Sequence, residues 1–179
     1  MKWIAALLLA FIMTACTVEE DDEVVLQRES DYVPVLMDAD KLEGSIEYQP
    51  HKALQNPGKF YLYGDFVFVS ERYKGVHIIN NADPVNPINV AFVRIPGCVD
   101  IAVKGTHLYA DNATDLVAID LSGLQNLDET KQVVVTKRLE GVLPEPSPPD
   151  GLEVPYEFRK DNRPDNTVIV EWKKNPEAD

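Results

Sequence analysis

The sequence has few of the residues on which cross-linked or metal-bound domains depend. Its 179 residues include two cysteines and three histidines. Cys16 lies in an N-terminal leader, so Cys98 lacks an intrachain partner and no disulfide framework is expected. No histidine or positive charge lies beside Cys98, which predicts a quiet, part-buried thiol. His77 and His107 have no ligand-spaced neighbour, so we expect strand histidines, no metal and no cofactor.

Positive charge is also scarce. Seventeen Lys and Arg residues stand against 30 Asp and Glu residues, a formal net charge of -13. Such a chain has no basic footprint for nucleic acid, and anionic lipid surfaces would repel it. We therefore expect no nucleic-acid partner, and membrane attachment would depend on acyl chains.

Familiar catalytic motifs are missing as well. The sequence has no G-x-S-x-G, no phosphate-cradling glycine loop and no Cys/His pair. Asp65, Asp100 and Asp111 are the candidates near strand ends for a carboxylate pair of the glycosidase kind. In a chain with 30 acids, three near strand ends are expected by chance and do not by themselves indicate a catalytic pair. The turn 111–115 offers oxygen ligands but lacks the length and glycine of an EF-hand loop. We predict no catalytic residue and no metal ligand.

The one long apolar run lies at the N-terminus. Lys2 precedes Ile4–Ile12, which is too short to span a bilayer as a helix. The run ends in Met13-Thr14-Ala15-Cys16, which resembles a bacterial lipobox. The resemblance predicts a signal peptide at 1–15 and lipidation of Cys16, with palmitate as a measurable acyl group. An ordinary signal peptide that contains cysteine is the alternative.

Five consecutive acids, Glu19 to Glu23, follow this cysteine. They repel one another, which predicts a solvated tether. The run also resembles the export signal of surface lipoproteins of the Bacteroidetes, which would place the protein at the outer membrane or cell surface. We assign 16–58 to a lipidated acidic tether and an extended arm. Within the arm, Asp38 is expected to cap a short helical turn.

Residues 59–140 contain two similar halves. Gly64 and Gly105 lie 41 residues apart, and Asn80 and Asp120 lie 40 apart. In each half, β-branched and aromatic runs alternate with Gly and Pro turn signals, which predicts strands. The matching runs are 60–69, 75–80 and 88–95 in the first half and 99–110, 115–120 and 132–139 in the second. A period near 40 built from four short strands is typical of a β-propeller blade. We predict an all-β, partial β-propeller-like fold of about two four-stranded antiparallel blades.

The phrase Gly75–Asn80 followed by Asp83-Pro84-Val85-Asn86-Pro87 resembles the LVIVD repeat of bacterial surface proteins, in which "LxVIDxSDPxxP" recurs in each blade. Leu116–Ser122 matches its first half, and the likeness ends at Gly123–Leu127. The signature positions are Asn80, Asp83, Pro84, Pro87 and Asp120. The resemblance to a short LVIVD-repeat lipoprotein of the Bacteroidetes type implies a propeller-like fold and no established chemistry. Asn80 and Asp120 have a structural use, because a short polar side chain at a strand end can bond the next turn.

The composition changes after Glu140. Residues 141–151 form a Pro-rich connector, and 152–179 form a C-terminal strand segment. Residues 152–158 are expected to return to strand, and 167–173 to form a last strand anchored by Trp172.

The leading prediction is a non-enzymatic, lipid-anchored interaction or scaffold module of the cell envelope. The alternatives are a propeller-type carbohydrate-binding or carbohydrate-active surface component, or a shortened relic of a longer propeller. Two blades are too few to close a propeller, so their faces lack neighbours. We expect the flanking segments to cover those faces incompletely, and a second copy or a protein partner to complete the propeller.

Overall fold

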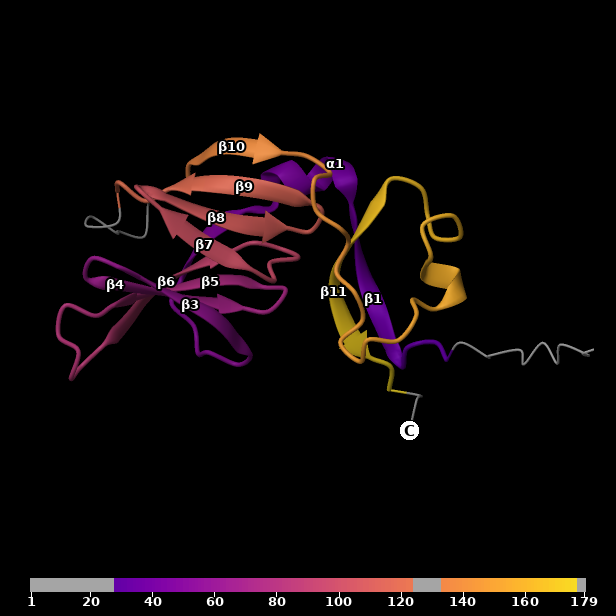
Figure 1. Ribbon diagram of the computed structural model, residues 1–179, viewed down its shortest axis with the longest axis horizontal. Helices are drawn as coiled ribbons and strands as arrows, with labels where there is room; N and C mark the ends of the chain where they lie inside the picture. The colour runs from indigo at the N-terminus through magenta and orange to yellow at the C-terminus, as the bar shows by residue number, and fades with distance from the viewer. Residues whose placement is uncertain (1–27, 124–132, 177–179) are drawn as a thin grey trace, which may run out of the picture.

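The computed structural model describes residues 28–123 and 133–176, and within these ranges the chain is all-β apart from one short helix and two short turns of 3-10 helix (Figure 1). Eleven strands form three antiparallel sheets of five, four and two strands, none of them closed within the described ranges. The strands are β1 (Tyr32–Asp38), β2 (Glu47–Pro50), β3 (Pro57–Tyr63), β4 (Phe66–Glu71), β5 (Gly75–Asn80), β6 (Ile88–Arg94), β7 (Ile101–Lys104), β8 (His107–Asn112), β9 (Asp115–Asp120), β10 (Val135–Leu139) and β11 (Thr167–Lys174).

The five-stranded sheet, called the first sheet below, has the order β2-β6-β5-β4-β3. Strands β3 to β6 are consecutive hairpins, as the repeat predicts. The turn between β3 and β4 holds Gly64 at φ +56, a conformation that favours glycine. The arm adds a fifth strand that the sequence does not reveal, because β2 pairs with the free side of β6 from Glu47 opposite Arg94 to Pro50 opposite Ala91.

The four-stranded sheet, called the second sheet, has the order β10-β9-β8-β7 and is again a meander of consecutive strands. Its turn between β7 and β8 holds Gly105 at φ +59, which matches Gly64 in the first sheet. The predicted repeat of four strands is therefore confirmed twice along the chain. Its last strand, β10, is shorter than the predicted run 132–139, since it begins at Val135.

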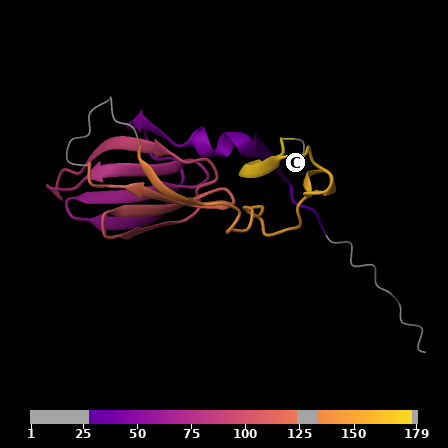
Figure 2. The same cartoon turned by 90° about the horizontal axis from the view of Figure 1, so that it is seen from above.

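The two sheets share one apolar core, and they lie at one end of the molecule (Figures 1 and 2). Period-two alternation sends every second side chain of each strand into this core. Its fully buried members include Phe68, Val76 and Ile95 near the first sheet and Leu108 and Val117 from the second.

The arm and the chain's last strand form a two-stranded ribbon at the other end of the molecule (Figure 1). Strand β1 pairs with β11 from Tyr32 opposite Lys174 to Asp38 opposite Thr167. Trp172 is 4% exposed and donates from Nε1 to the Pro146 carbonyl at 2.7 Å, so it anchors β11 as expected. The flanking segments thus pair with each other and build two small cores that also include Ala113 and Tyr73 from turns of the two sheets.

Two local expectations have different outcomes. Asp38 caps the helix α1 (Ala39–Leu42) by accepting from the Asp40 backbone N–H at 2.9 Å, which confirms the predicted cap. The expectation of a strand over 152–158 is wrong. That segment holds the 3-10 turn η3 (Tyr156–Phe158). Its pairing with the arm is a single isolated bridge between Glu153 and Glu29, which is too little to form a strand.

Some sequence predictions lie outside the described residues. The signal peptide, the lipobox with Cys16 and the acidic run all precede residue 28. Most of the segment where the repeat phrase breaks off, 124–127, also lies outside. In the part of the chain that is described, no helix is long and apolar enough to cross a membrane.

Candidate functional site

The face of the second sheet that points away from the first sheet is open and partly apolar. We call it the second outer face, defined by Tyr109, Leu116, Ala118, Lys137 and Leu139. Tyr109 and Leu116 are half-buried and Leu139 is 45% exposed. A shallow hollow of about 210 Å³ lies in this face, lined by these side chains together with Thr136 and His107.

The face of the first sheet that points away from the second sheet carries protruding apolar side chains. We call its open part the first outer face, defined by Phe60, Leu62, Val67, Val69 and Ile79. Phe60 is 69% exposed and Leu62 is 68% exposed, whereas Val67, Val69 and Ile79 are half-buried. Exposed large apolar groups that are contiguous on a sheet mark interaction sites in soluble proteins. Phe60 and Leu62 stand on β3, whose second edge has no strand bonded to it in the described sheets.

The other part of that same face is covered and holds a buried polar network. His77 Nε2 lies 2.6 Å from Glu71 Oε2, and both side chains are at most 4% exposed. The Asn89 amide donates to His77 Nδ1 at 3.2 Å and to the Lys52 carbonyl at 2.8 Å. The Lys52 ammonium lies 3.7 Å from Glu71 Oε2 and 3.6 Å from the centre of the Phe92 ring. His77 is therefore a satisfied strand histidine, as expected.

The repeat relates the faces of the two sheets. The spacing of 41 between Gly64 and Gly105 places Tyr109 at the position of Phe68, and the spacing of 40 in the next strand places Val117 at that of His77. Phe68 points into the shared core, and its counterpart Tyr109 points to the second outer face. His77 points outward, and Val117 points into the core. The repeat positions that face the core in the first sheet thus face outward in the second sheet. Both sheets therefore point the same repeat positions in the same direction along the stack.

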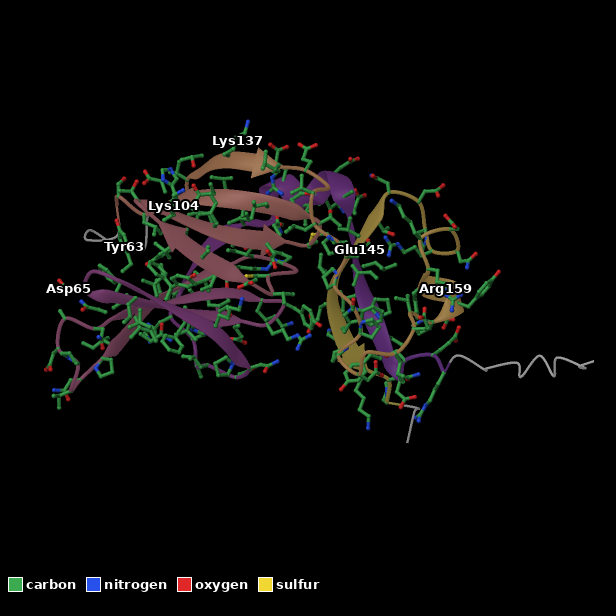
Figure 3. All side chains as sticks on the ribbon, in the orientation of Figure 1. Tyr63, Asp65, Lys104, Lys137, Glu145 and Arg159 are labelled. Atoms are coloured by element: carbon green, nitrogen blue, oxygen red, sulfur yellow. The ribbon has the colours of Figure 1, made fainter. Side chains whose placement is uncertain are left out.

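The candidate carboxylates separate into a cluster and an outlier. Asp111 Oδ2 accepts from the Asp100 backbone N–H at 2.9 Å, and Lys59 Nζ lies 2.5 Å from Asp100 Oδ2. Burial raises the pKa of Asp111, and the hydrogen bond from Asp100 opposes this rise. The hydrogen bond to Asp100 raises the pKa of Lys59. Asp65 lies in the turn between β3 and β4 (Figure 3), whereas Lys59 lies within β3.

Cys98 lies beside this cluster and is fully buried, beyond the partial burial expected. Burial, with the Asp111 and Asp100 carboxylates adding to it, raises the pKa of the thiol. A thiol that stays protonated is a poor nucleophile, so Cys98 acts here as a small core residue.

The repeat-signature residues at the strand ends bond the following turns. Asn80 Oδ1 accepts from the Ala82 backbone N–H at 2.9 Å. Asp120 accepts from the Ser122 N–H at 2.8 Å and its hydroxyl at 2.7 Å, and these bonds lower the pKa of Asp120. Both residues therefore have the structural use that the sequence predicts.

The remaining signature residues form the turn between β5 and β6. Asp83 accepts from the Asn86 side chain at 2.9 Å and from the Val85 N–H at 3.1 Å, and the bond from Asn86 is the main cause of a lowered pKa. Pro84 and Pro87 belong to the same exposed turn. None of the five signature positions lines the second outer face or its hollow.

A hollow of about 560 Å³ lies between the first sheet and the ribbon. Four cations line it in a chain of net negative charge: Lys41, Lys52, Lys74 and Arg94. Lys74 pairs with Glu171 of β11 at 2.6 Å. Lys74 thus joins the first sheet to the ribbon, whereas Lys52 and Arg94 pair with Glu71 and Glu47 of the first sheet.

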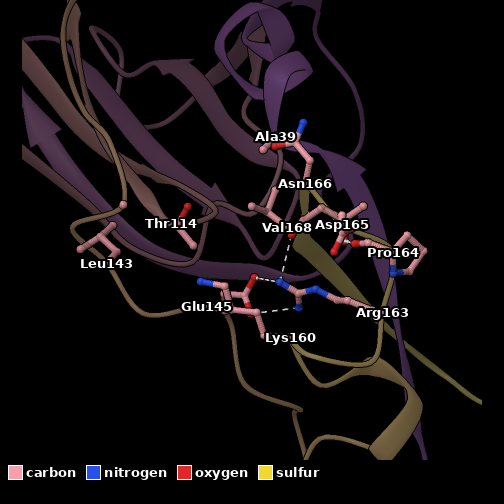
Figure 4. Close-up of a pocket in the computed structure, with 12 residues that line it drawn as sticks. Ala39, Thr114, Leu143, Glu145, Lys160, Arg163, Pro164, Asp165, Asn166 and Val168 are labelled. Carbon is pink, nitrogen blue, oxygen red and sulfur yellow. Dashed lines mark hydrogen bonds and ion pairs between the residues drawn. The ribbon is translucent and has the colours of Figure 1, made fainter.

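A second hollow, of about 570 Å³, lies beside the C-terminal turn (Figure 4). Arg163 reaches across it, where both terminal nitrogens donate to Glu145 and one also donates to the Thr167 carbonyl at 3.0 Å. Its side chain is 3% exposed, so the pair fixes the Pro-rich connector to β11. Nothing in the sequence indicates this pair, because Arg163 and Glu145 both stand in segments read as irregular.

The turn 111–115 is committed to internal bonds. Asp115 binds Arg138 at 2.6 Å and accepts from the Gly141 N–H at 2.9 Å, whereas Asp111 bonds Asp100. Among the described residues, no group of three or more His, Cys, Asp or Glu side chains is placed to hold a metal ion.

Comparison of the chain with protein-family models, with curated proteins and with solved structures gave no match. The resemblance to the LVIVD repeat therefore rests on the phrases in the sequence and stays a prediction. The lipobox and the surface address stay predictions too.

Proposed function

We propose that this protein is a lipid-anchored, non-enzymatic interaction module of the cell envelope, and that its two sheets act as neighbouring blades of a propeller-like assembly. The observation that carries the proposal is the pair of open outer faces. Phe60 and Leu62 protrude from one, and a hollow lined by Tyr109 and Leu116 indents the other. A protein that functions alone gains nothing from two such faces, whereas a module that stacks on a partner uses both.

The stacking sense of the sheets supports the propeller-like part of the proposal. Blades of a propeller follow one another around an axis, so each presents one face to the preceding blade and the other to the next. The correspondence of Phe68 with Tyr109, and of His77 with Val117, is what this arrangement requires. Two sheets packed as mirror images would bury corresponding faces against each other.

The anchor is proposed from the sequence. Met13-Thr14-Ala15-Cys16 supplies the lipidated cysteine, and Glu19 to Glu23 form the spacer that separates it from the fold. We expect labelled palmitate to enter the wild-type chain and Cys16→Ala to abolish that labelling and release the protein from membranes. Equal labelling of wild type and Cys16→Ala would contradict the anchor.

The interaction function is tested by site-specific photocrosslinking on intact cells. A benzophenone amino acid replaces Tyr109 in one strain and the exposed Val85 in a control strain. We expect a defined protein adduct from position 109 and none from position 85, because Val85 stands in a turn apart from both outer faces. The absence of an adduct from position 109, and from position 60 in a third strain, would overturn the proposed function.

A second candidate function is a carbohydrate-binding or carbohydrate-active surface component. The observation in its favour is the cluster of Asp100, Asp111 and Lys59. A carboxyl group whose pKa burial raises is suited to general acid catalysis. A screen for glycan binding and hydrolysis separates the two functions, because an activity lost in Asp111→Asn and in Asp100→Asn would favour this candidate.

A further inference from the structure

One outer face carries protruding side chains, the other carries a hollow, and apolar side chains contribute to both. The first outer face presents two knobs, Phe60 and Leu62, that are more than two-thirds exposed. The second outer face presents a hollow of about 210 Å³ whose walls include Leu116 and Leu139. A knob on one surface and a pocket elsewhere on the same molecule define a head-to-tail contact between copies.

The repeat indicates which surface fits the second outer face. That face corresponds to the face of the first sheet that the second sheet already covers. We therefore expect the second outer face to pack against a face that presents the same repeat positions as the core face of the second sheet. Within the described chain, the one free face of that kind is the first outer face, which another copy can supply. The contact would continue the sheet-to-sheet packing already present inside each copy.

The number of sheets indicates how such contacts close. Each copy supplies two stacked sheets, and propellers are built from four blades or more. Two copies related by a two-fold axis supply four sheets, and each outer face then meets its complement once on either side of the axis. Head-to-tail contacts that fail to close would instead produce open filaments.

We propose that the partner of the second outer face is the first outer face of a second copy of this chain, so that two copies form a closed ring of four sheets. This rests on the proposed interaction function and names its partner. Lys52 lies over the Phe92 ring and its carbonyl accepts from Asn89 beside His77, so the contact uses strands β3 to β5 away from the Lys52 segment.

The test is sedimentation equilibrium of the full chain carrying Cys16→Ser, which removes the acyl group. We expect a species of twice the monomer mass at micromolar concentration. Phe60→Asp and Leu116→Asp should each raise the dissociation constant at least about tenfold, because each places a carboxylate in both apolar contacts of the pair. Val85→Asp adds the same charge to a side chain that is 86% exposed in a turn, and it should leave the dissociation constant unchanged.

Mixing the two weakened variants gives the sharpest result. A mixed pair combines the intact second outer face of Phe60→Asp with the intact first outer face of Leu116→Asp, so one sound contact returns. Association should recover in the mixture and in neither variant alone, while circular dichroism shows that both variants are folded. A pair formed by two identical faces would show no such recovery, and that result would overturn the proposal.

Other outcomes also decide the matter. A folded monomer at all concentrations, or a series of open polymers, would overturn the closed pair. If position 109 crosslinks to a different envelope protein while the chain stays monomeric, the proposed interaction function stands and self-pairing is wrong. Leu62→Cys in one copy and Tyr109→Cys in another should form a disulfide in the mixture alone, since Cys98 is buried.

Discussion

In the first sheet the outward positions at the end of β4 and in β5 hold Glu71 and His77, whereas the corresponding positions of the second sheet hold Asn112 and Val117. The two middle strands of each meander are alike, with six residues in each of β4, β5, β8 and β9. What differs is the cover: the Lys52 segment lies over the Glu71–His77 pair, and the first sheet lies over Val117. The backbone pattern of the repeat is therefore independent of the covering partner, and the side chains at each position are adapted to it.

The two sheets also differ in how the arm contacts their edges. The arm pairs with the first sheet through β2, and the Arg94 guanidinium donates to the Ser45 carbonyl at 3.0 Å. At the second sheet the arm adds no strand, and Arg138 instead donates to the Glu43 carbonyl at 3.3 Å while it pairs with Asp115. One sheet is extended by the arm, and the other is only tied to it.

The largest expected effect concerns a glycine that the second repeat replaces with Asp115. Gly75 begins β5 at φ +141, and a Cβ there would lie 2.0 Å from the Val93 carbonyl oxygen. Gly75→Ala must displace β5 from β6, so we expect the free energy of unfolding to fall by at least about 4 kcal/mol. Gly64→Ala is the control, because nothing lies within 4 Å and only its positive φ is strained, at about 1 kcal/mol. Denaturant unfolding of both variants measures this, and equal losses would contradict the backbone contact.

The next effect breaks the polar network of the first sheet. Glu71→Ala leaves His77 and Lys52 without their shared carboxylate beneath the covering segment. We expect a loss of about 3 kcal/mol, because the variant breaks a buried pair and leaves its partners unpaired. Glu71→Gln keeps an acceptor for His77 and should lose less in the same unfolding measurement. A loss from Glu71→Ala no greater than from Glu71→Gln would show that the acceptor for His77 adds nothing to the stability of the sheet.

An exchange between the repeats sharpens the comparison. Val117→His buries an imidazole in the apolar core with no carboxylate at the Asn112 position, and we expect a loss of about 2 kcal/mol. His77→Val leaves Glu71 with Lys52 alone and should have an effect of similar size. The double variant should show the sum of both losses, because the two side chains face different layers. A double variant as stable as the wild type would show that the two positions are interchangeable.

The smallest effect concerns the exposed turns that follow β5 and β9. Hydrogen bonds lower the pKa of Asp83 and Asp120 below the ordinary 3.8. Their contribution to stability is therefore fully present above pH 3.8 and is lost as the pH falls through the folded-state values. Asp83→Asn and Asp120→Asn should each make the fall in stability below pH 4 slightly less steep. Unfolding midpoints measured from about pH 2 to pH 7 check the sign.

The sequence predicts the two meanders well because their signals are local. Short β-branched runs and turn glycines such as Gly64 and Gly105 determine strands and hairpins within ten residues of one another. The helix cap at Asp38 is equally local. The strands β1 and β2 were not predicted, because an isolated run such as Glu47–Pro50 becomes a strand only through a distant partner.

The sequence predicts that the blade faces lack neighbours, but it does not predict which residues form those faces. Which of two alternating sets faces the core depends on the packing partner, and the pattern in 66–69 is apolar on both sides. The buried pairs of Glu71 with His77 and of Arg163 with Glu145 were also missed. A charged residue carries no mark of burial in the sequence, since its partner comes from elsewhere in the fold.

The pairing of β1 with β11 has a consequence for the order in which the chain folds. β1 is the first described strand to be synthesised, and its partner is the last. Both meanders consist of neighbouring strands and can form while the chain is still growing, but the ribbon must wait until Thr167–Lys174 has been made. Until then β1 has no strand to pair with. Completion of the ribbon thus reports that the whole described chain has been made, and a truncation before residue 167 would leave β1 as an open edge.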